Sequence, residues 1–264
     1  MGLSNILIPV GIFAGLGILF GILLAVASKV FAVKTDERIE QIGEVLPGAN
    51  CGGCGFSGCG ALAEAIVKGT APANACRAGG EECAKKIGEI MGIAVTAQTP
   101  VKARVLCSGG CGNAKEKCHY EGAQDCIAAD RMYGGDKACP AGCMGLGTCV
   151  QVCRYDALHV VDGTAQVDTS KCTGCGACSQ ICPKHIIALV PVTAKYSVDC
   201  HSPEPGAQTR KLCAVGCIGC KICEKNCPSD AVHVVGNLAV IDYEKCTACG
   251  LCASKCPRKI IREH

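Results

Sequence analysis

The sequence lacks tryptophan, and its aromatic residues make up only 3% of 264 residues. Aromatic rings usually dominate the packing of a core, so this chain must gain stability from another source. Its formal net charge of +3 is too small to indicate a nucleic-acid partner. There is also no glycine-rich dinucleotide fingerprint, no catalytic pair of carboxylates and no Ser/His/Asp arrangement. We therefore predict no catalytic residues and no NAD or flavin site on this chain.

Cysteine is the residue that the sequence has in excess, with 27 copies. Such a density predicts a disulfide scaffold or a metal protein. Small secreted disulfide domains use scattered cysteines, whereas most cysteines here fall in tight C-x2-C-x2-C-x3-C runs. Cysteines so close in sequence are poorly placed to pair with each other, but they can surround one polynuclear cluster. The runs therefore predict iron–sulfur clusters in a reducing compartment, and a chain that folds poorly without them.

An apolar run begins the chain, with no charged side chain from residue 1 to residue 28. It is long enough to cross a bilayer core, which takes about 20 residues. A cleaved signal peptide is the alternative, but nothing basic precedes the run and its length exceeds that of a usual signal. Lys29, Lys34 and Arg38 follow it. Since basic residues favour the cytoplasmic side, we predict a single-pass protein of the inner (plasma) membrane, with a transmembrane helix over 1–33 and a cytoplasmic iron–sulfur body.

The first group of cysteines has a C-x2-C-x4-C-x16-C spacing. Its members are Cys51, Cys54, Cys59 and Cys76. Glycines between them let backbone amides approach cluster sulfurs. A zinc site fits less well, because its ligands usually come as two separated C-x2-C pairs. Residues 60–69 and 81–91 have helical periodicity, and Cys83, in the second of these, is expected to be a buried free thiol. We predict a four-cysteine [4Fe–4S] domain over residues 34–98.

The rest of the chain contains a repeat of 74 residues. In each copy, a helical turn and a small hairpin, over 158–168 and 232–242, separate two cysteine runs. This is the layout of a bacterial two-cluster ferredoxin, in which three cysteines of one run and the last cysteine of the other hold each cluster. We predict an α+β fold with two tandem ferredoxin-like modules, over 137–195 and 196–264, after a cysteine-containing lead-in over 99–136.

The ferredoxin pattern assigns three complete ligand sets. They are Cys172, Cys175, Cys178 and Cys153; Cys217, Cys220, Cys223 and Cys256; and Cys246, Cys249, Cys252 and Cys227. The fourth set has Cys143, Cys149 and Cys182, but Leu146 stands where its remaining cysteine would be. We predict Cys139 as the fourth ligand, although its repeat counterpart Cys213 exists where no ligand is missing. The glycines on either side of residue 146 should bring backbone amides closer to this cluster.

The four-cysteine domain and these four sets give five predicted [4Fe–4S] clusters. Besides Cys83, the cysteines outside them are Cys107, Cys111, Cys118, Cys126, Cys200 and Cys213. Two interpretations stay open: some of them bind a sixth cluster, or they are small buried thiols that pack against the modules. The repeat aligns Asp125 and Cys126 with Asp199 and Cys200 in sequence. Both copies therefore have a C-x12-C pair before the ferredoxin pattern: Cys126 with Cys139, and Cys200 with Cys213.

The order of apolar helix, four-cysteine domain and polyferredoxin body resembles the B subunit of the Rnf complex over nearly the whole chain. The motifs that carry the resemblance are "VLPGANCGGCGF", "GCMGLGTC" and "CIGCKICEKNCPSDAVHV", and Ser57 stands where the family pattern has proline. They are similar to the longer, cluster-rich form of anaerobic bacteria. In that family, the complex couples electron flow from reduced ferredoxin to NAD+ with pumping of Na+ or H+, and its flavins lie on other subunits.

The resemblance implies that this chain accepts electrons from soluble ferredoxin near one end of the polyferredoxin. It implies that the four-cysteine domain passes them to integral and peripheral subunits of the complex in the lipid bilayer. There are three alternatives: a subunit of the related complex that reduces a redox regulator, an iron–sulfur carrier or scaffold, and a redox sensor. The first is expected to hold fewer clusters, the second needs labile ligands, and no DNA-binding or signalling segment supports the third.

Overall fold

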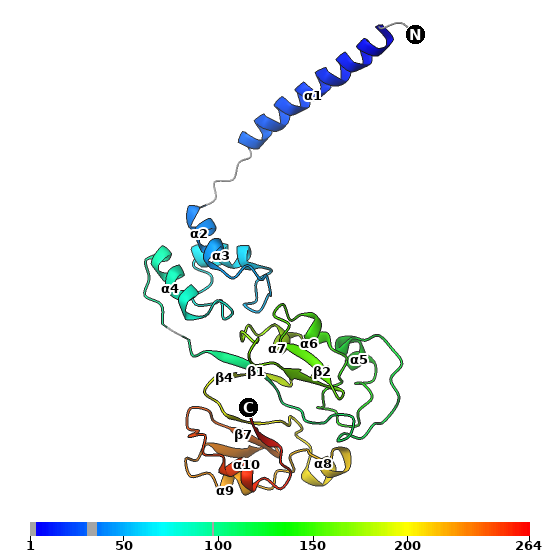
Figure 1. Cartoon of the computed structure of the whole chain (residues 1–264), viewed down its shortest axis with the longest axis vertical. Helices are drawn as coiled ribbons and strands as arrows, with labels where there is room; N and C mark the ends of the chain where they lie inside the picture. The colour runs from blue at the N-terminus through cyan, green and yellow to red at the C-terminus, as the bar shows by residue number, and fades with distance from the viewer. Residues whose placement is uncertain (1–3, 31–35, 97) are drawn as a thin grey trace. The chain divides into compact units, whose positions relative to one another are not determined.

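The computed structural model describes residues 4–30, 36–96 and 98–264. The chain divides into two compact units, Met1–Glu37 and Arg38–His264. The first contains one long helix, α1 (Ser4–Val30) (Figure 1). Its segment Val10–Lys29 has a mean hydropathy of 2.6, and it is long and apolar enough to cross a bilayer. Lys34 and the predicted boundary beside it lie outside the described residues, so the orientation of the chain in the membrane stays a prediction.

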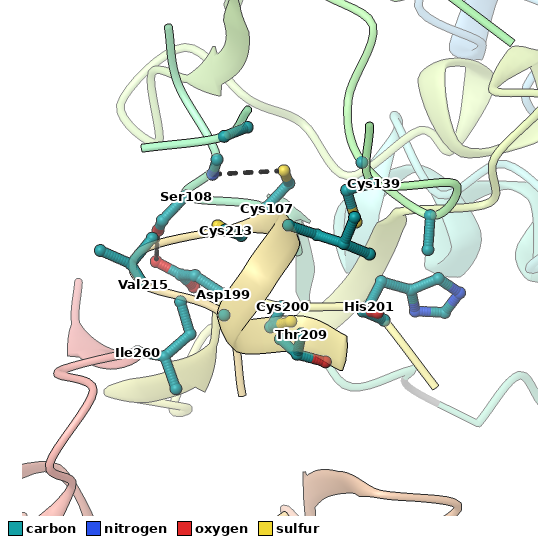
Figure 2. Close-up of a pocket in the computed structure, with 17 residues that line it drawn as sticks. Cys107, Ser108, Cys139, Asp199, Cys200, His201, Thr209, Cys213, Val215 and Ile260 are labelled. Atoms are coloured by element: carbon teal, nitrogen blue, oxygen red, sulfur yellow. Dashed lines mark hydrogen bonds between the residues drawn. The ribbon is translucent and has the colours of Figure 1, made fainter. Parts of the chain in front are cut away.

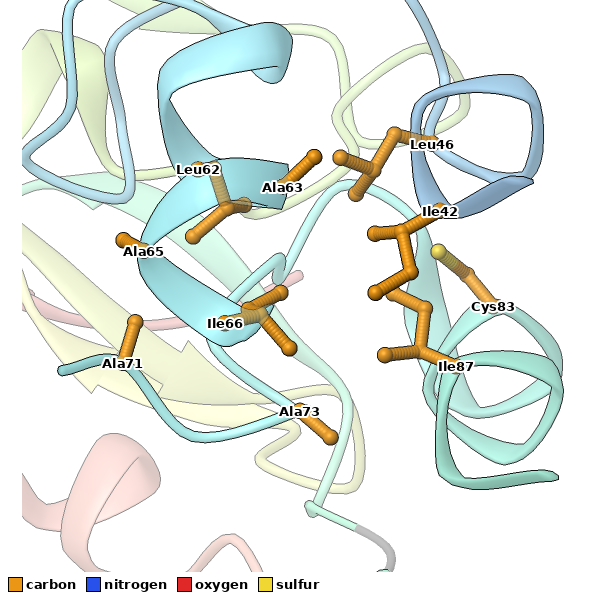
Figure 3. Close-up of a cluster of buried hydrophobic side chains, with 10 residues drawn as sticks. All are labelled: Ile42, Leu46, Leu62, Ala63, Ala65, Ile66, Ala71, Ala73, Cys83 and Ile87. Atoms are coloured by element: carbon orange, nitrogen blue, oxygen red, sulfur yellow. The ribbon is translucent and has the colours of Figure 1, made fainter. Parts of the chain in front are cut away.

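Three helices follow and form a small domain, which we call the helical domain. They are α2 (Glu37–Val45), α3 (Cys59–Val67) and α4 (Gly80–Met91). Their apolar faces meet in a core where Ile42, Leu62, Ile66 and Ile87 are at most 2% exposed (Figure 3). Full burial of one such side chain contributes about 1.5–3 kcal/mol, so aliphatic residues hold this core together. The two helices that periodicity predicted here are confirmed.

Two antiparallel hairpins follow the repeat of the sequence. They are β2 (Leu158–Val161) with β3 (Thr164–Val167), and β6 (Val232–Val235) with β7 (Leu238–Ile241). Asp162 and Gly163 form the first turn, and Gly236 and Asn237 form the second. All four residues have positive φ, which a two-residue type I′ turn requires. Both predicted hairpins are confirmed.

Each hairpin belongs to a module that has a second two-stranded sheet. In the first module (residues 137–195 with the preceding strand), β1 (Val101–Val105) pairs with β4 (Ile187–Pro191). In the second module (196–264), β5 (Tyr196–Val198) pairs with β8 (Ile261–Glu263). The remaining helices are α5 (Cys126–Met132), α6 (Thr148–Gln151), α7 (Ala177–Ile181), α8 (Gly206–Leu212), α9 (Ile222–Lys225) and α10 (Leu251–Lys255). The α+β fold class is confirmed.

Candidate iron–sulfur centres

Three of the four predicted ligand cysteines of the helical domain lie against its core. Cys54, Cys59 and Cys76 pack against the core residues. The side chain of Asn50 accepts a 2.8 Å hydrogen bond from the backbone N–H of Cys59, which holds the start of α3. Burial and the charge of Cys51 raise the pKa of Cys175 in the first module, and the two thiols share a hydrogen bond. Cys51 therefore lies beside the cysteine set of the first module.

Cys83 is buried, as predicted, but it is not isolated. It shares a hydrogen bond with Cys76, and this bond is the main reason why the pKa of Cys76 is raised and the pKa of Cys83 is lowered. The charge of Cys59 also acts on Cys83. Cys83 thus lies next to two of the four proposed ligands of the domain, a position that the sequence spacing did not indicate.

In each of the three complete cysteine sets of the modules, the structure brings the four members close to one another. Each set has a buried central member, Cys178, Cys223 or Cys252. Burial raises the pKa of all three, to about 12 for Cys178 and to about 11 for Cys223, and the charges of the other three members of each set act on it. One of these sets lines a pocket that measures about 340 Å³ including the space open to solvent; the set consists of Cys217, Cys220, Cys223 and Cys256.

The incomplete set of the first module has a different fourth cysteine from the one expected. A pocket of about 410 Å³ is lined by Cys126, Cys143, Cys149 and Cys182. Burial raises the pKa of Cys149 to about 12, and the charges of Cys143, Cys126 and Cys182 raise it as well. Cys139 does not line this pocket, so the structure does not bring it to the set in which the sequence placed it.

A series of hydrogen bonds explains why Cys126 reaches this pocket. The Cys126 N–H donates to Thr148 Oγ1 at 2.6 Å, and the Thr148 hydroxyl donates to the Asp125 carboxylate at 3.1 Å. Asp125 also caps α5 by accepting the N–H of Ala128 at 2.7 Å, and this bond is the main reason why its pKa is lowered. Because Thr148 immediately precedes Cys149 and is buried, these bonds tie the start of α5 to the cysteine run.

A third pocket also has four cysteines, and it measures about 440 Å³ including the space open to solvent. Its cysteines are Cys107, Cys139, Cys200 and Cys213 (Figure 2). Burial raises the pKa of Cys139, and it raises the pKa of Cys200 to about 11. The other two cysteines considered for an extra cluster lie elsewhere: Cys111 is exposed, and the thiol of Cys118 contacts the carbonyl of Gly135 at 3.7 Å.

Backbone N–H groups point at several of these sulfurs. Ala157 donates to Cys153 Sγ at 3.4 Å, Ala231 donates to Cys227 Sγ at 3.2 Å, and Ala165 donates to Cys143 Sγ at 3.4 Å. Hydrogen bonds to ligand sulfurs are one determinant of the potential of an iron–sulfur cluster. All 27 cysteines are free of disulfides. Within residues 4–30, 36–96 and 98–264, no three His, Cys, Asp or Glu side chains are placed to hold a single metal ion.

These features fit [4Fe–4S] clusters. Each pocket offers four thiols, and protonated buried thiols must give up their protons when iron binds. A bound cluster would supply one-electron redox chemistry. The contribution of the chain is to position the thiolates, to exclude water and to direct backbone dipoles at the sulfurs.

Two family models match the chain in the regions just described. The Fe-S cluster model matches residues 46–78, and the model for a 4Fe-4S binding domain matches residues 165–188 and 239–262. The two ferredoxin matches are offset by the length of the repeat. The chain is therefore an iron–sulfur protein.

Three curated relatives match it over nearly its full length. It is 45% identical to the B subunit of the ion-translocating oxidoreductase complex of Methanosarcina acetivorans, over 98% of this chain and 99% of the relative. It is 46% identical to the B subunit of the Na(+)-translocating ferredoxin:NAD(+) oxidoreductase complex of Acetobacterium woodii, over 98% and 78%. It is 41% identical to the B subunit of the corresponding proton-translocating complex of Clostridium ljungdahlii, over 94% and 88%. The chain therefore belongs to the family of Rnf complex B subunits, the iron–sulfur electron-transfer subunits of ion-translocating oxidoreductase complexes.

Proposed function

We propose that this chain accepts electrons from reduced ferredoxin and passes them through [4Fe–4S] clusters to the membrane subunits of an ion-translocating ferredoxin:NAD+ oxidoreductase. Ferredoxin and NAD+ are named for the relatives from A. woodii and C. ljungdahlii. The observation that carries the proposal is that the cysteine sets adjoin. Members of both sets of the first module lie in one buried cluster, members of both sets of the second module lie in another, and Cys51 lies beside Cys175. Reduction of NAD+, flavin chemistry and transport of Na+ or H+ are assigned to other subunits, because this sequence has no dinucleotide fingerprint and no charged residue within the apolar run.

Five clusters are assigned to cysteine thiolates. Their proposed ligands are Cys51, Cys54, Cys59 and Cys76; Cys126, Cys143, Cys149 and Cys182; Cys153, Cys172, Cys175 and Cys178; Cys217, Cys220, Cys223 and Cys256; and Cys227, Cys246, Cys249 and Cys252. Cys126 replaces Cys139 as the fourth ligand of the second set, because it lines that pocket.

The helical domain is the proposed exit for electrons. Besides the contact of Cys51 with Cys175, the Gln180 side chain donates to the Gly53 carbonyl at 3.0 Å. A Cβ atom at Gly53 would lie only 2.2 Å from the carbonyl oxygen of Cys175, so glycine is needed for this close approach. The cluster of the helical domain and one cluster of the first module would thus be neighbours, and a single electron can pass between them.

The second module is the proposed docking site for ferredoxin. Cys220 and Cys249, one from each of its two sets, are exposed, whereas every proposed ligand of the first module is buried or half-buried. Lys221 and Lys245 are next to ligands of this module in sequence, and both side chains are more than half exposed. Exposed lysines beside accessible clusters suit an acidic redox partner, because opposite charge accelerates association.

The membrane placement is proposed on the same terms. The helix α1 would span the bilayer, and the iron–sulfur body would lie on the cytoplasmic side, where Lys29 and Arg38 follow the apolar run. Soluble ferredoxin is then within reach of the second module.

The test is anaerobic mixing of the full chain with reduced ferredoxin, followed by the loss of visible iron–sulfur absorbance and the rise of electron paramagnetic resonance (EPR) signals from reduced clusters. We expect fast reduction that slows with added salt. The double variant Lys221→Glu/Lys245→Glu should slow association about tenfold or more at low ionic strength.

Lys68→Glu/Lys85→Glu is the matched control, since both lysines are exposed on the helical domain. It should leave the rate unchanged. A fully loaded protein that reduced ferredoxin does not reduce would contradict the proposed function. Equal slowing by both double variants would contradict docking at the second module.

A further inference from the structure

We propose that Cys107, Cys139, Cys200 and Cys213 bind a further [4Fe–4S] cluster at the junction of the two ferredoxin-like modules, which we call the bridging cluster. We infer that it relays electrons between the modules, and this relay role rests on the proposed function. The presence of a cluster at the site does not rest on the proposed function, because it is inferred from the pocket alone.

Equivalent structures from the two modules build this pocket. Cys107 lies two residues after β1 ends, and Cys200 lies two residues after β5 ends. The residue before each cysteine makes the same backbone bond: Leu106 N–H donates to Ile186 at 2.7 Å, and Asp199 N–H donates to Ile260 at 2.9 Å. Since Ile186 and Ile260 are repeat counterparts, Cys107 and Cys200 occupy equivalent positions.

The second pair of cysteines is equivalent as well. Cys139 and Cys213 are repeat counterparts, and so are Gly142 and Gly216, which also line the pocket. A Cβ atom would lie 3.7 Å from Cys139 Sγ if added at Gly142, and 3.9 Å from Cys213 Sγ if added at Gly216. Each module therefore offers two thiols and one glycine from matching places.

The sulfurs receive hydrogen bonds from matching places as well. The N–H of Cys143 donates to Cys107 Sγ at 3.4 Å, and the N–H of Cys217 donates to Cys200 Sγ at 3.4 Å. Gly109 adds a second N–H donor to Cys107 Sγ at 3.4 Å. Such bonds stabilise thiolates that ligate a cluster. Isolated buried thiols have no need of three backbone donors directed at two of them.

The same hydrogen bonds place the bridging cluster between two others. Cys143 and Cys217 are proposed ligands of one cluster in each module, and each donates its own N–H to a bridging sulfur. Cys143 therefore links the bridging site to a cluster site of the first module, and Cys217 links it to one of the second module.

The segment after β1 is clamped between the modules, which holds Cys107 in position. Ser108 N–H donates to the Asp199 carbonyl at 2.9 Å, and Cys111 N–H donates to the Asp162 carbonyl at 3.0 Å. In the second module, the guanidinium of Arg258 donates to the carbonyl of Cys213 at 2.8 Å. These bonds hold the backbone next to Cys107 and at Cys213.

The pocket is comparable to the two pockets that are lined by ferredoxin-type cysteine sets. Including the space open to solvent, it measures about 440 Å³ and they measure about 410 and 340 Å³. A Cβ atom added at Gly109 would lie 3.4 Å from Cys107 Sγ and 3.7 Å from Cys213 Sγ. These two sulfurs, which come from different modules, therefore face one small space (Figure 2).

The relay step is a simple electron transfer. A cluster held by Cys107, Cys139, Cys200 and Cys213 would accept one electron from a reduced cluster of the second module and would pass it to a cluster of the first module. Each donor would be oxidised by one electron as its acceptor is reduced by one. No bond to a ligand forms or breaks, and the electron comes from reduced ferredoxin.

The first experiment counts clusters in the full chain, purified without oxygen. With the bridging cluster, wild-type protein should contain about 24 iron atoms and about 24 sulfide ions per chain; five clusters alone would give about 20. Native mass spectrometry of the same sample counts clusters without any substitution. A wild-type count of five clusters, or one zinc ion per chain in place of the sixth cluster, would overturn the proposal.

The second experiment removes the bridging ligands. Cys200→Ser/Cys213→Ser should lose about four iron atoms and four sulfide ions per chain and keep the other clusters. Cys111→Ser, in the same clamped segment but outside the pocket, is the control and should lose none. A double variant that keeps the wild-type iron content and native mass would contradict the assignment, and the native mass of wild-type protein decides the matter if the variant does not fold.

The third experiment tests the relay. Freeze-quench EPR after mixing with reduced ferredoxin should show all clusters reduced rapidly in wild type. In Cys200→Ser/Cys213→Ser, only the clusters of the second module should be reduced in the fast phase. If all remaining clusters are reduced at the wild-type rate, the relay is refuted while the proposed function stands. If ferredoxin reduces neither protein, the proposed function fails while the cluster count still decides the site.

Discussion

The two ferredoxin-like modules have the same hairpins and the same cysteine crossover, but their routes from the leading strand to the first cysteine run differ. In the second module, Cys213 follows Cys200 after one short helix, α8. In the first module, a much longer connection with α5 lies between Cys107 and Cys139. This insertion provides Cys126, which lines the pocket of Cys143, Cys149 and Cys182. The comparison teaches that an anchored segment far away in sequence can bring a fourth thiol to an incomplete motif.

The two modules also differ in how exposed their cysteines are to solvent. At the position equivalent to Leu146, the second module has Cys220, which is exposed. The replacement, Cys126, is half-buried and lies at the start of a helix. Since exposure and hydrogen bonding both influence cluster potential, the clusters of the two modules should differ in potential, and this difference can direct electrons along the chain.

The largest expected effect comes from removing the replacement ligand. Cys126→Ser should convert one cluster of the first module to a three-iron form or lose it, with a fall of about one to four iron atoms per chain. Iron analysis and the EPR signal of a three-iron cluster in oxidised protein measure this change. Cys118→Ser, in the same insertion but outside the pocket, is the control. A wild-type iron content and no three-iron signal in Cys126→Ser would show that Cys126 is not a ligand.

The next prediction restores the ligand at its place in the motif. The residues on either side of position 146 have φ of 73° and 80°, and those beside Cys220 have φ of 62° and 59°, so the two backbones match. Leu146→Cys added to Cys126→Ser should therefore recover the iron content and remove the three-iron signal. Leu146→Ser in the same background cannot supply a thiolate and should recover neither. If Leu146→Cys fails as well, the two motifs do not place position 146 equivalently.

Much of the fold could be predicted from the sequence, because the helices of the helical domain and both hairpins depend on local periodicity and turn residues. The grouping of cysteines was predictable where the members of a set are close in sequence. It was not predictable where the insertion shifts the register between the two copies of the repeat. The 74-residue repeat aligns Cys126 with Cys200, whereas the strand pairing aligns Cys107 with Cys200. Cys139 is near Cys143 in sequence, yet its thiol lines another pocket. Long-range hydrogen bonds decide both cases, and cysteine spacing does not reveal them.

A smaller effect is expected from loosening the anchor of Cys126. Thr148→Val removes the hydroxyl that joins the Cys126 N–H to Asp125. The part-buried Cys126 N–H loses this partner, at a cost of about 1 kcal/mol. We expect faster loss of iron to a chelator and a lower unfolding temperature, with the full cluster content retained before the challenge. Ile222 takes the place of Thr148 in the second module, so Ile222→Val is the control and should change the chelation rate little. Equal rates in both variants would show that the bonds of Thr148 do not hold the ligand.

The smallest predicted effect compares the two hairpin turns. Gly163→Ala and Gly236→Ala both place a side chain at positive φ, 67° and 56°, which costs about 1–2 kcal/mol. The added Cβ meets nothing within 4 Å at Gly236, but at Gly163 it lies 2.6 Å from Cys111 Sγ. Because Cys111 is exposed, its thiol can move aside, so Gly163→Ala should lower the unfolding temperature only slightly more than Gly236→Ala. Cys111→Ala should remove this difference. If it persists in Gly163→Ala/Cys111→Ala, the insertion restricts the first hairpin through contacts other than this thiol.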